Sequence, residues 1–281
     1  ATGIAVGMNS FLSKSLGEGN RERANRSAGN GILLTLMAVA LFMAFGFFGA
    51  GPFYAMQTTE LEVVEGGTAY TSICCIFTAG IFIEVLGERL LQASGRTIYT
   101  LYTQGTGAIL NIILDPLFIF GYEPLGIPAM GIAGAAVATV IGQWVAAIMA
   151  VIFNFTSNPD VQFALKYLKP DGYIIKKILA VGIPSVIMMA IGSVMNFGMN
   201  QILQGFSETA TGVFGIYFKL QSFFFMPLFG INNAVISIVA FNYGARNPER
   251  MMKTVKMACA AGLCIMLTGL AAFQLIPEVL L

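Results

Sequence analysis

The chain has 281 residues, of which 57% are hydrophobic and only 10% are charged, against about 25% charged residues in a typical soluble protein. So few charges cannot cover a water-soluble surface, and we therefore expect an all-α protein that crosses a membrane several times. The net charge is +1 and histidine is absent, which argues against a nucleic-acid partner, histidine metal sites and Ser-His or Cys-His catalysis.

Eight hydrophobic stretches approach or exceed the length of about 20 residues that a helix needs to cross a bilayer. They lie at residues 1–16, 30–50, 69–92, 97–120, 131–154, 178–204, 212–241 and 257–277. The first is short and begins without Met, and almost nothing follows the last, so we expect a part of a longer transporter or channel. Four cysteines lie in these stretches, and we interpret them as reduced packing residues: Cys74, Cys75, Cys259 and Cys264.

Basic residues alternate from one connection to the next. Of the 15 Lys and Arg residues, all except Lys219 lie in or beside the first, third, fifth and seventh connections, whereas the even connections hold Glu. The positive-inside rule places the basic side in the cytoplasm. The only long polar connection predicts an N-terminal lobe at 1–155, a cytoplasmic linker at 156–177 and the start of a C-terminal lobe at 178–281.

An internal repeat relates the first connection to the seventh. Six identities at one constant offset support it: Gly3, Ser10, Gly17, Asn20, Glu22 and Arg23 match Gly230, Ser237, Gly244, Asn247, Glu249 and Arg250. Both copies run from a hydrophobic stretch of the same direction into a cytoplasmic connection. Two pseudo-symmetric lobes of six helices, with substrate between them, would fit this spacing and are a known transporter architecture.

Several motifs resemble those of the multidrug and toxic compound extrusion (MATE) transporters, in the order in which that family has them. They are Gly3-x3-Gly7-x-Asn9-Ser10, Asn111-x2-Leu114-Asp115-Pro116, Gly131-x2-Gly134-Ala135, Gly182-Ile183-Pro184-Ser185 and Asn242-Tyr243-Gly244-Ala245. The resemblance covers essentially the whole chain. It implies a protein of twelve helices in two six-helix lobes, of which this chain would hold helices two to nine.

The resemblance also implies a function, namely antiport across the cell membrane in which H⁺ or Na⁺ drives the export of bulky, often cationic organic compounds. The two lobes would give alternating access, with small organic substrates, no cofactor beyond the coupling ion, and activity as a monomer. In one branch of the family an Asn and an Asp on the fifth helix bind the ion with a carboxylate of the first, and Asn111 and Asp115 match that pair. Another branch uses a Glu on the seventh helix, but residues 178–203 contain no acid. We therefore expect the coupling site in the N-terminal lobe.

Asp115 also stands out without the resemblance. It lies inside the stretch 97–120, about 9 Å from its outer end, where an ionisable group costs about 2.5–3.5 kcal/mol. Asn111 is one turn earlier on the same face, and Thr139 and Gln143 of the next stretch reach similar depths. We predict that Asp115, Asn111 and Thr139 bind the coupling cation. The alternative is that Asp115 is a structural helix-end residue near the headgroups.

Other polar residues within the hydrophobic stretches are weaker candidates. Four of them are predicted to line the substrate cavity: Gln143, Asn196, Asn200 and Lys219. Buried amides also serve as ordinary hydrogen-bond partners between helices, and Lys219 could instead extend its ammonium to the interface. We interpret Glu84, with Glu88 one turn later, as a structural residue that reaches the cytoplasmic interface.

Functions of other classes have less support. A lipid-linked precursor flippase of related architecture is the alternative, but its pyrophosphate would require several cations in the cavity, where only Lys219 qualifies. A membrane-embedded enzyme is not expected, because His and a plausible Ser-Lys pair are both missing. The chain has no G-x-x-x-x-G-K-[ST] loop and is not expected to hydrolyse ATP itself.

Overall fold

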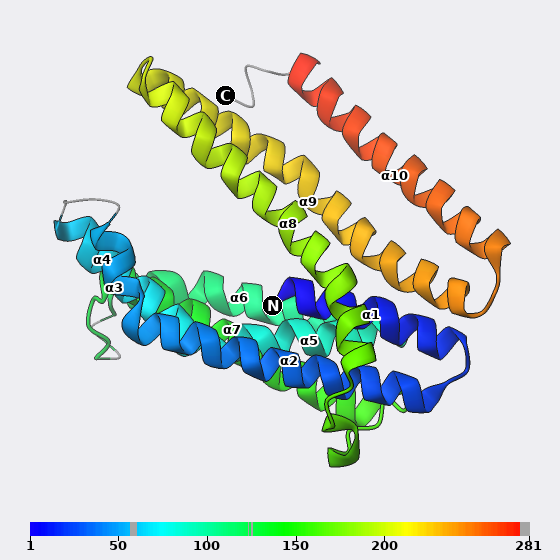
Figure 1. The fold of residues 1–281 in the computed structure, drawn as a ribbon. Helices are drawn as coiled ribbons and strands as arrows, with labels where there is room; N and C mark the ends of the chain where they lie inside the picture. Colours follow the sequence, from blue (N-terminus) through cyan, green and yellow to red (C-terminus); the bar gives the residue numbers. More distant parts are fainter. Residues whose placement is uncertain (57–60, 123, 125, 276–281) are drawn as a thin grey trace.

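The computed structural model describes residues 1–56, 61–122, 124 and 126–275, and these residues are almost entirely helical (Figure 1). The prediction of an all-α fold is confirmed. The helices are α1 (Thr2–Gly17), α2 (Arg21–Phe48), α3 (Ala50–Ala55), α4 (Leu61–Ile76), α5 (Ala79–Ala93), α6 (Thr97–Phe120), α7 (Gly131–Ser157), η2 (Leu165–Leu168), α8 (Gly172–Gln204), α9 (Glu208–Gly244) and α10 (Pro248–Leu275).

Most of the predicted membrane spans are confirmed within the described ranges. Six helices, α2, α6, α7, α8, α9 and α10, are each long and apolar enough to cross a membrane, and α4 with α5 can form a seventh crossing. The short first stretch, predicted at 1–16, corresponds to α1, which has 16 residues. α2 and α10 begin at Arg21 and Pro248, well before the predicted hydrophobic stretches at 30–50 and 257–277. A helix can continue beyond the membrane core through polar residues, which a search for hydrophobic stretches does not include.

The prediction of one continuous helix over 69–92 is wrong. This part of the chain forms α4 and α5, which meet at a bend of 49°. At the bend, Nε1 of Trp144 on α7 donates a hydrogen bond of 3.3 Å to the Phe77 carbonyl. The indole also packs on Gly80, where a Cβ would lie 2.9 Å from it. The bend is therefore stabilised by a side chain from another helix, which hydropathy along the chain cannot reveal.

α1 lies between the two groups of helices that form the lobes. It packs against α2 and α5 on one side and against α8 and α9 on the other. Its Met8, Phe11 and Leu12 side chains join a buried cluster that also contains Ile174 and Ile178 from the start of α8. The first turns of α8 are therefore packed into the core of the N-terminal lobe.

Glycines let α1 approach α8 and α9 closely. A Cβ at Gly3 would lie 2.9 Å from the carbonyl oxygen of Gly182, and a Cβ at Gly17 would lie 2.9 Å from the carbonyl carbon of Phe241. The contact is reciprocal, because a Cβ at Gly244 would lie 3.0 Å from the backbone nitrogen of Glu18. Backbone atoms occupy the space that any side chain would need, as in close helix packing inside membranes.

The predicted internal repeat is confirmed in backbone detail. The backbone N–H of Asn20 donates to the Ser15 backbone carbonyl at 2.9 Å, and the backbone N–H of Asn247 donates to the Asn242 backbone carbonyl at 2.9 Å. Each asparagine side chain then accepts a hydrogen bond from the amide three residues later, at 2.9 and 3.1 Å. These asparagines precede α2 and α10, which have 28 residues each, so sequence, cap and helix length all repeat.

The polar segment after α7 is folded onto the N-terminal lobe. The Asn25 side-chain oxygen accepts a hydrogen bond of 2.8 Å from the backbone N–H of Gln162. The Asn30 side-chain oxygen accepts one of 2.9 Å from the backbone N–H of Asp171. Asp160 lies 3.5 Å from the guanidinium of Arg21. The predicted interlobe linker is therefore held against α2 by hydrogen bonds and an ion pair.

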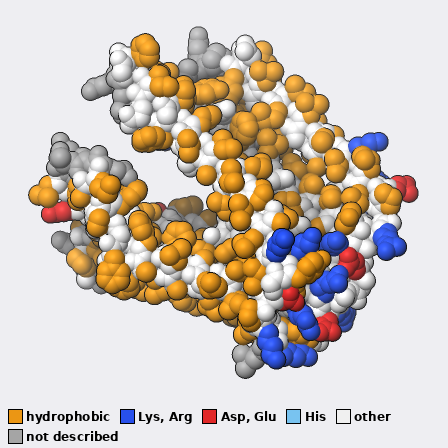
Figure 2. All heavy atoms as spheres, in the orientation of Figure 1, with side chains coloured by type: hydrophobic (Ala, Val, Ile, Leu, Met, Phe, Trp, Pro, Cys, Tyr) orange, Lys and Arg blue, Asp and Glu red, His pale blue; other side chains and the backbone are white. Residues whose placement is uncertain are grey.

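The two lobes diverge from the region where α1 crosses α8 and α9 (Figure 1). One arm consists of α2 to α7, and the other consists of α9, α10 and the part of α8 beyond its first turns. The space-filling view shows a hollow between these two arms, and it shows blue basic side chains gathered at the end where the arms join (Figure 2). Past Pro184, large apolar side chains of α8 such as Met188 and Phe197 are exposed. By the positive-inside rule the hollow opens away from the cytoplasm.

Candidate functional site

Asp115 lies in the last turns of α6 and is followed by Pro116. Its Oδ1 atom is enclosed and has no hydrogen-bond partner among the described residues. Because proline has no N–H, the carbonyl of Ile112, four residues before Pro116, has no helical donor either. One stretch of α6 therefore carries a carboxylate oxygen and a backbone oxygen that the helix leaves without donors.

The structure brings Asn111 of α6 and Thr139 of α7 together. The Asn111 Nδ2 donates to the Thr139 hydroxyl over 3.3 Å, and this hydroxyl donates to the Ala135 carbonyl over 2.9 Å. Asn111 thus directs its amide nitrogen at α7 and retains its oxygen for another partner. Asp115 is one turn further along the same face of α6, so these three predicted residues form one polar patch between the two helices.

Gln143 lies one turn after Thr139 on α7 and is partly buried. Beside it, Gly142 faces α6, where a Cβ would lie 3.0 Å from the Gly107 carbonyl oxygen. Gln143 is therefore close to the α6–α7 contact, although no hydrogen bond joins its side chain to the described residues.

Tyr70 of α4 is a member of this patch that the sequence analysis missed. Its phenol lies within hydrogen-bonding reach of Thr139 and Cys74, and it is close enough to Asp115 to interact electrostatically. The sequence offered one signal, a tyrosine within a predicted span. Its position beside Thr139 depends on how α4 packs against α7, which hydropathy does not predict.

The remaining predicted cavity residues lie on the other arm. Asn196 and Asn200 of α8 are partly buried and hydrogen-bond to each other, with 3.3 Å between Nδ2 of Asn200 and Oδ1 of Asn196. Lys219 of α9 is exposed. The structure does not bring these three residues together with Asp115, because α6 and α7 form no extended contact with α8 or α9.

The polar groups of the α6–α7 patch offer oxygen atoms, and Asp115 supplies the carboxylate. Within the described ranges, no three His, Cys, Asp or Glu side chains gather closely enough to hold a metal ion. Asp115 instead offers one carboxylate beside neutral amide, hydroxyl and carbonyl oxygens. Such a set can accept a proton or surround Na⁺, as ionisable groups and broken helices do in other transporters.

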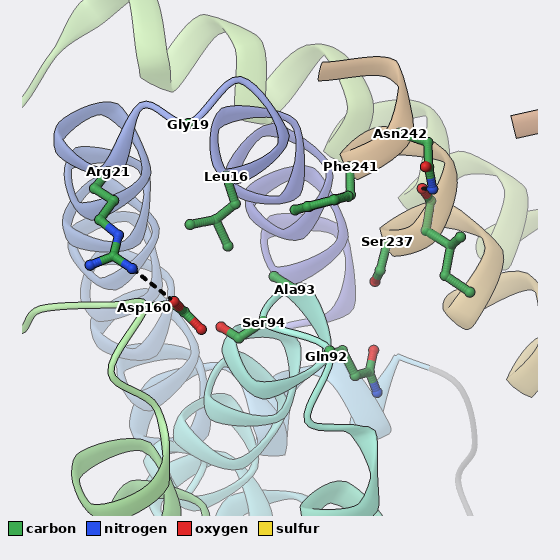
Figure 3. Close-up of a pocket in the computed structure, with 12 residues that line it drawn as sticks. Leu16, Gly19, Arg21, Gln92, Ala93, Ser94, Asp160, Ser237, Phe241 and Asn242 are labelled. Carbon is green, nitrogen blue, oxygen red and sulfur yellow. Dashed lines mark hydrogen bonds and ion pairs between the residues drawn. The ribbon is translucent and has the colours of Figure 1, made fainter. Parts of the chain in front are cut away.

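A separate cavity of about 600 Å³ lies at the joined, basic end of the arms. Figure 3 shows that α1, the end of α5 and α9 contribute its walls, with Leu16, Gln92 and Phe241 around it. The ion pair between Arg21 and Asp160 lies at one side. The cavity is on the cytoplasmic side by the positive-inside rule and is distinct from the patch around Asp115.

Comparison with known proteins identifies the family. The MatE family model matches residues 1–117 and 184–281, which is most of the chain. This chain belongs to the MatE family. The prediction made from the motifs is confirmed, and as a MatE protein with several confirmed spans the chain is a multi-pass protein of the cell membrane.

Similar proteins cover nearly the whole of this MatE chain. The probable multidrug resistance protein NorM of Thermotoga maritima is 27% identical over 281 residues, covering 99% of this chain and 59% of that protein. The multidrug export protein MepA of Staphylococcus haemolyticus is 26% identical over 196 residues, covering 70% of this chain and 42% of that protein. The MatE chain thus spans about half the length of these curated relatives.

Solved structures share the fold. A MOP superfamily transporter from Pyrococcus furiosus is 25% identical with a TM-score of 0.89, and the match covers 99% of this chain and 61% of that one. The MATE multidrug transporter DinF-BH is 28% identical with a TM-score of 0.86, covering 99% and 61%. MepA is named as a multidrug export protein, NorM as a probable multidrug resistance protein and DinF-BH as a multidrug transporter, and the flippase alternative finds no support among these names.

Proposed function

We propose that the protein carrying this MatE chain is a cation-coupled antiporter that exports bulky, often cationic organic compounds. The observation that carries the proposal is the enclosed Asp115 Oδ1, which has no partner among the described residues. A buried carboxylate oxygen without a donor is costly, and a proton or Na⁺ would remove that cost. The family and the names of its multidrug-exporting relatives support an export role.

Coupling in this proposal depends on a difference in cation affinity between two facing states. Asp115 and Asn111 lie on α6, and Thr139 lies on α7, so a change in the packing of these helices alters the distances within the patch. A cation that binds more tightly in one packing shifts the population toward it, by no more than that difference in affinity. Either H⁺ or Na⁺ is compatible with this donor set.

Substrate would bind in the hollow between the arms. Its walls are proposed to include exposed Met side chains that share one face of α8, such as Met188 and Met195, because flexible apolar side chains suit large organic molecules of varied shape. Asn196 and Asn200 are the polar groups proposed to contact substrate there, and Lys219 stays a candidate. The protein is proposed to act as a monomer.

Substitution at Asp115 tests the proposal in the full-length protein reconstituted in proteoliposomes with a fluorescent organic cation. Asp115→Asn keeps the shape but cannot bind a proton, so gradient-driven efflux is expected to be abolished while substrate still binds. Asp115→Glu keeps the charge and is expected to retain part of the efflux, and Asn111→Ala is expected to be milder. Lys219→Ala is the control, which should leave the ion dependence unchanged. Wild-type efflux by Asp115→Asn, with the same ion dependence, would overturn the proposal.

A further inference from the structure

A pair of carboxylates lies inside the N-terminal lobe, on the cytoplasmic side of the Asp115 patch. Glu84 and Glu88 are one turn apart on α5, and their exposed fractions are 9% and 3%. Glu84 precedes the last residue of α5, Ala93, by nine positions, about 14 Å along the helix. The interpretation that Glu84 reaches the interface is therefore wrong, because its face of α5 points into the lobe.

Glu88 has the partners that an ionised carboxylate needs. The Thr103 hydroxyl donates to its Oε1 at 2.7 Å, and the Gln104 amide donates to its Oε2 at 2.8 Å. Both donors come from α6, and both carboxylate oxygens accept. The neighbouring Arg89 is 8% exposed and supplies one positive charge beside it.

Glu84 has no such partners. No hydrogen bond or ion pair reaches its carboxylate from the described residues, and the charged group that acts on it is Glu88. Arg89 bonds instead to Gln92, at 2.6 Å, while its Nε is enclosed without a partner. If both glutamates were ionised, the lobe would enclose two negative charges against one positive charge, at high cost. A proton on Glu84 would leave the group neutral.

No other described charge faces Glu84 from the helices packed against α5, which are α1, α2, α6, α7 and α9. α7 has no charged residue, and the only charged residue of α6 is Asp115, 12 positions beyond Thr103 and about 18 Å along the helix. Lys219 of α9 lies on the other arm. The charged residues of α1 and α2 lie at their cytoplasmic ends: Lys14, Arg21, Glu22, Arg23 and Arg26. The phenols of α6 are engaged or exposed, with Tyr99 against Phe153 and Tyr102 at the surface.

We propose that Glu84 is a second proton-binding site of the N-terminal lobe, placed between the Asp115 patch and the cytoplasmic end. Glu84 carries one proton in the state described here, while Glu88 stays ionised between Thr103, Gln104 and Arg89. α5 runs antiparallel to α6, so Glu84 is about 6 Å nearer to the level of Asp115 than Glu88 is. A role of Glu84 in passing protons between Asp115 and the cytoplasm rests on the proposed cation-coupled function. The protonation of Glu84 itself does not depend on that function.

Infrared spectroscopy of the full-length protein in lipid nanodiscs tests the protonation directly. At neutral pH we expect the carbonyl band of a neutral carboxylic acid in the wild type, shifted in heavy water. Glu84→Gln should remove the contribution of Glu84 to that band, whereas Glu62→Gln, at an exposed position of α4, should not. Asp115→Asn separates any contribution of Asp115, so a failure of the coupling proposal remains distinguishable. A band unchanged in Glu84→Gln would overturn the assignment.

Thermal unfolding of Glu84→Gln and Glu88→Gln gives an independent test, because the two substitutions are expected to affect the unfolding temperature differently. Glutamine resembles protonated glutamate, so Glu84→Gln is expected to unfold at the same temperature as the wild type or higher. Glu88→Gln is expected to unfold at a lower temperature, because Arg89 would lose its counter-charge. A lower midpoint for Glu84→Gln than for Glu88→Gln would mean that Glu84 is the ionised partner and would overturn the proposal.

Discussion

The crossing of α1 and α9 predicts a large effect of a single methyl group. In Gly17→Ala the new Cβ would lie 2.9 Å from the Phe241 carbonyl carbon and 3.0 Å from the Ala245 nitrogen, and it would overlap the Phe241 oxygen. Ordinary contacts between such atoms are about 3.5–4.0 Å, so the helices must separate by about 1 Å. Backbone atoms cannot rotate away, and overpacking of this kind costs about 1–3 kcal/mol. The expected fall in the thermal midpoint is about 2–12 °C.

The measurement is thermal unfolding of the purified protein, with two matched variants. Gly244→Ala places its methyl at the same crossing from the other helix, so it should lower the midpoint similarly, and the double variant should cost less than the sum. Gly105→Ala is the control within α6, because nothing lies within 4 Å of a Cβ there, and better helix propensity should raise stability by up to about 1 kcal/mol. Equal midpoints for Gly17→Ala and the wild type would refute the steric reasoning.

Two further predictions concern the repeat and the topology. Arg246 has φ 53°, and its equivalent in the first copy is Gly19 with φ 71°, so Arg246→Gly should raise the thermal midpoint and Gly19→Ala should lower it. The expected size is about 1 kcal/mol for a left-handed residue, and equal midpoints would show that the conformation carries no cost. Single cysteines at Glu62 and Lys169 should react oppositely with an impermeant thiol reagent added outside cells. Labelling is expected at position 62 and not at 169, and the reverse pattern would overturn the orientation.

The sequence allowed the fold to be predicted where a property is local or repeats along the chain. Hydropathy located most of the spans, and the constant offset of the six identities located the repeat, because both can be read along the chain. The bend between α4 and α5 was missed, because it depends on Trp144, a residue of another helix that bonds to the Phe77 carbonyl. The cysteines Cys259 and Cys264 were interpreted as packing residues, but both are exposed on α10.

The candidate site follows the same division. Asn111 and Asp115 could be paired from their spacing on one helix, and the predicted depth of Thr139 agrees with its hydrogen bond to Asn111. Tyr70 could not be assigned, because its place beside Thr139 depends on the packing of α4. Glu84 was misplaced because distance from a helix end does not say which face of the helix is buried.

The burial of Ile174 and Ile178 in the N-terminal lobe has a mechanical consequence for α8. Its base is anchored in one lobe while its far half belongs to the other arm, so the helix acts as a lever with its fulcrum near Gly182. Pro184 removes a helical hydrogen bond just beyond that point and lowers the resistance to bending there. From Gly182 to Gln204 the lever is about 33 Å long, so a bend of about 10° would displace its tip by about 6 Å.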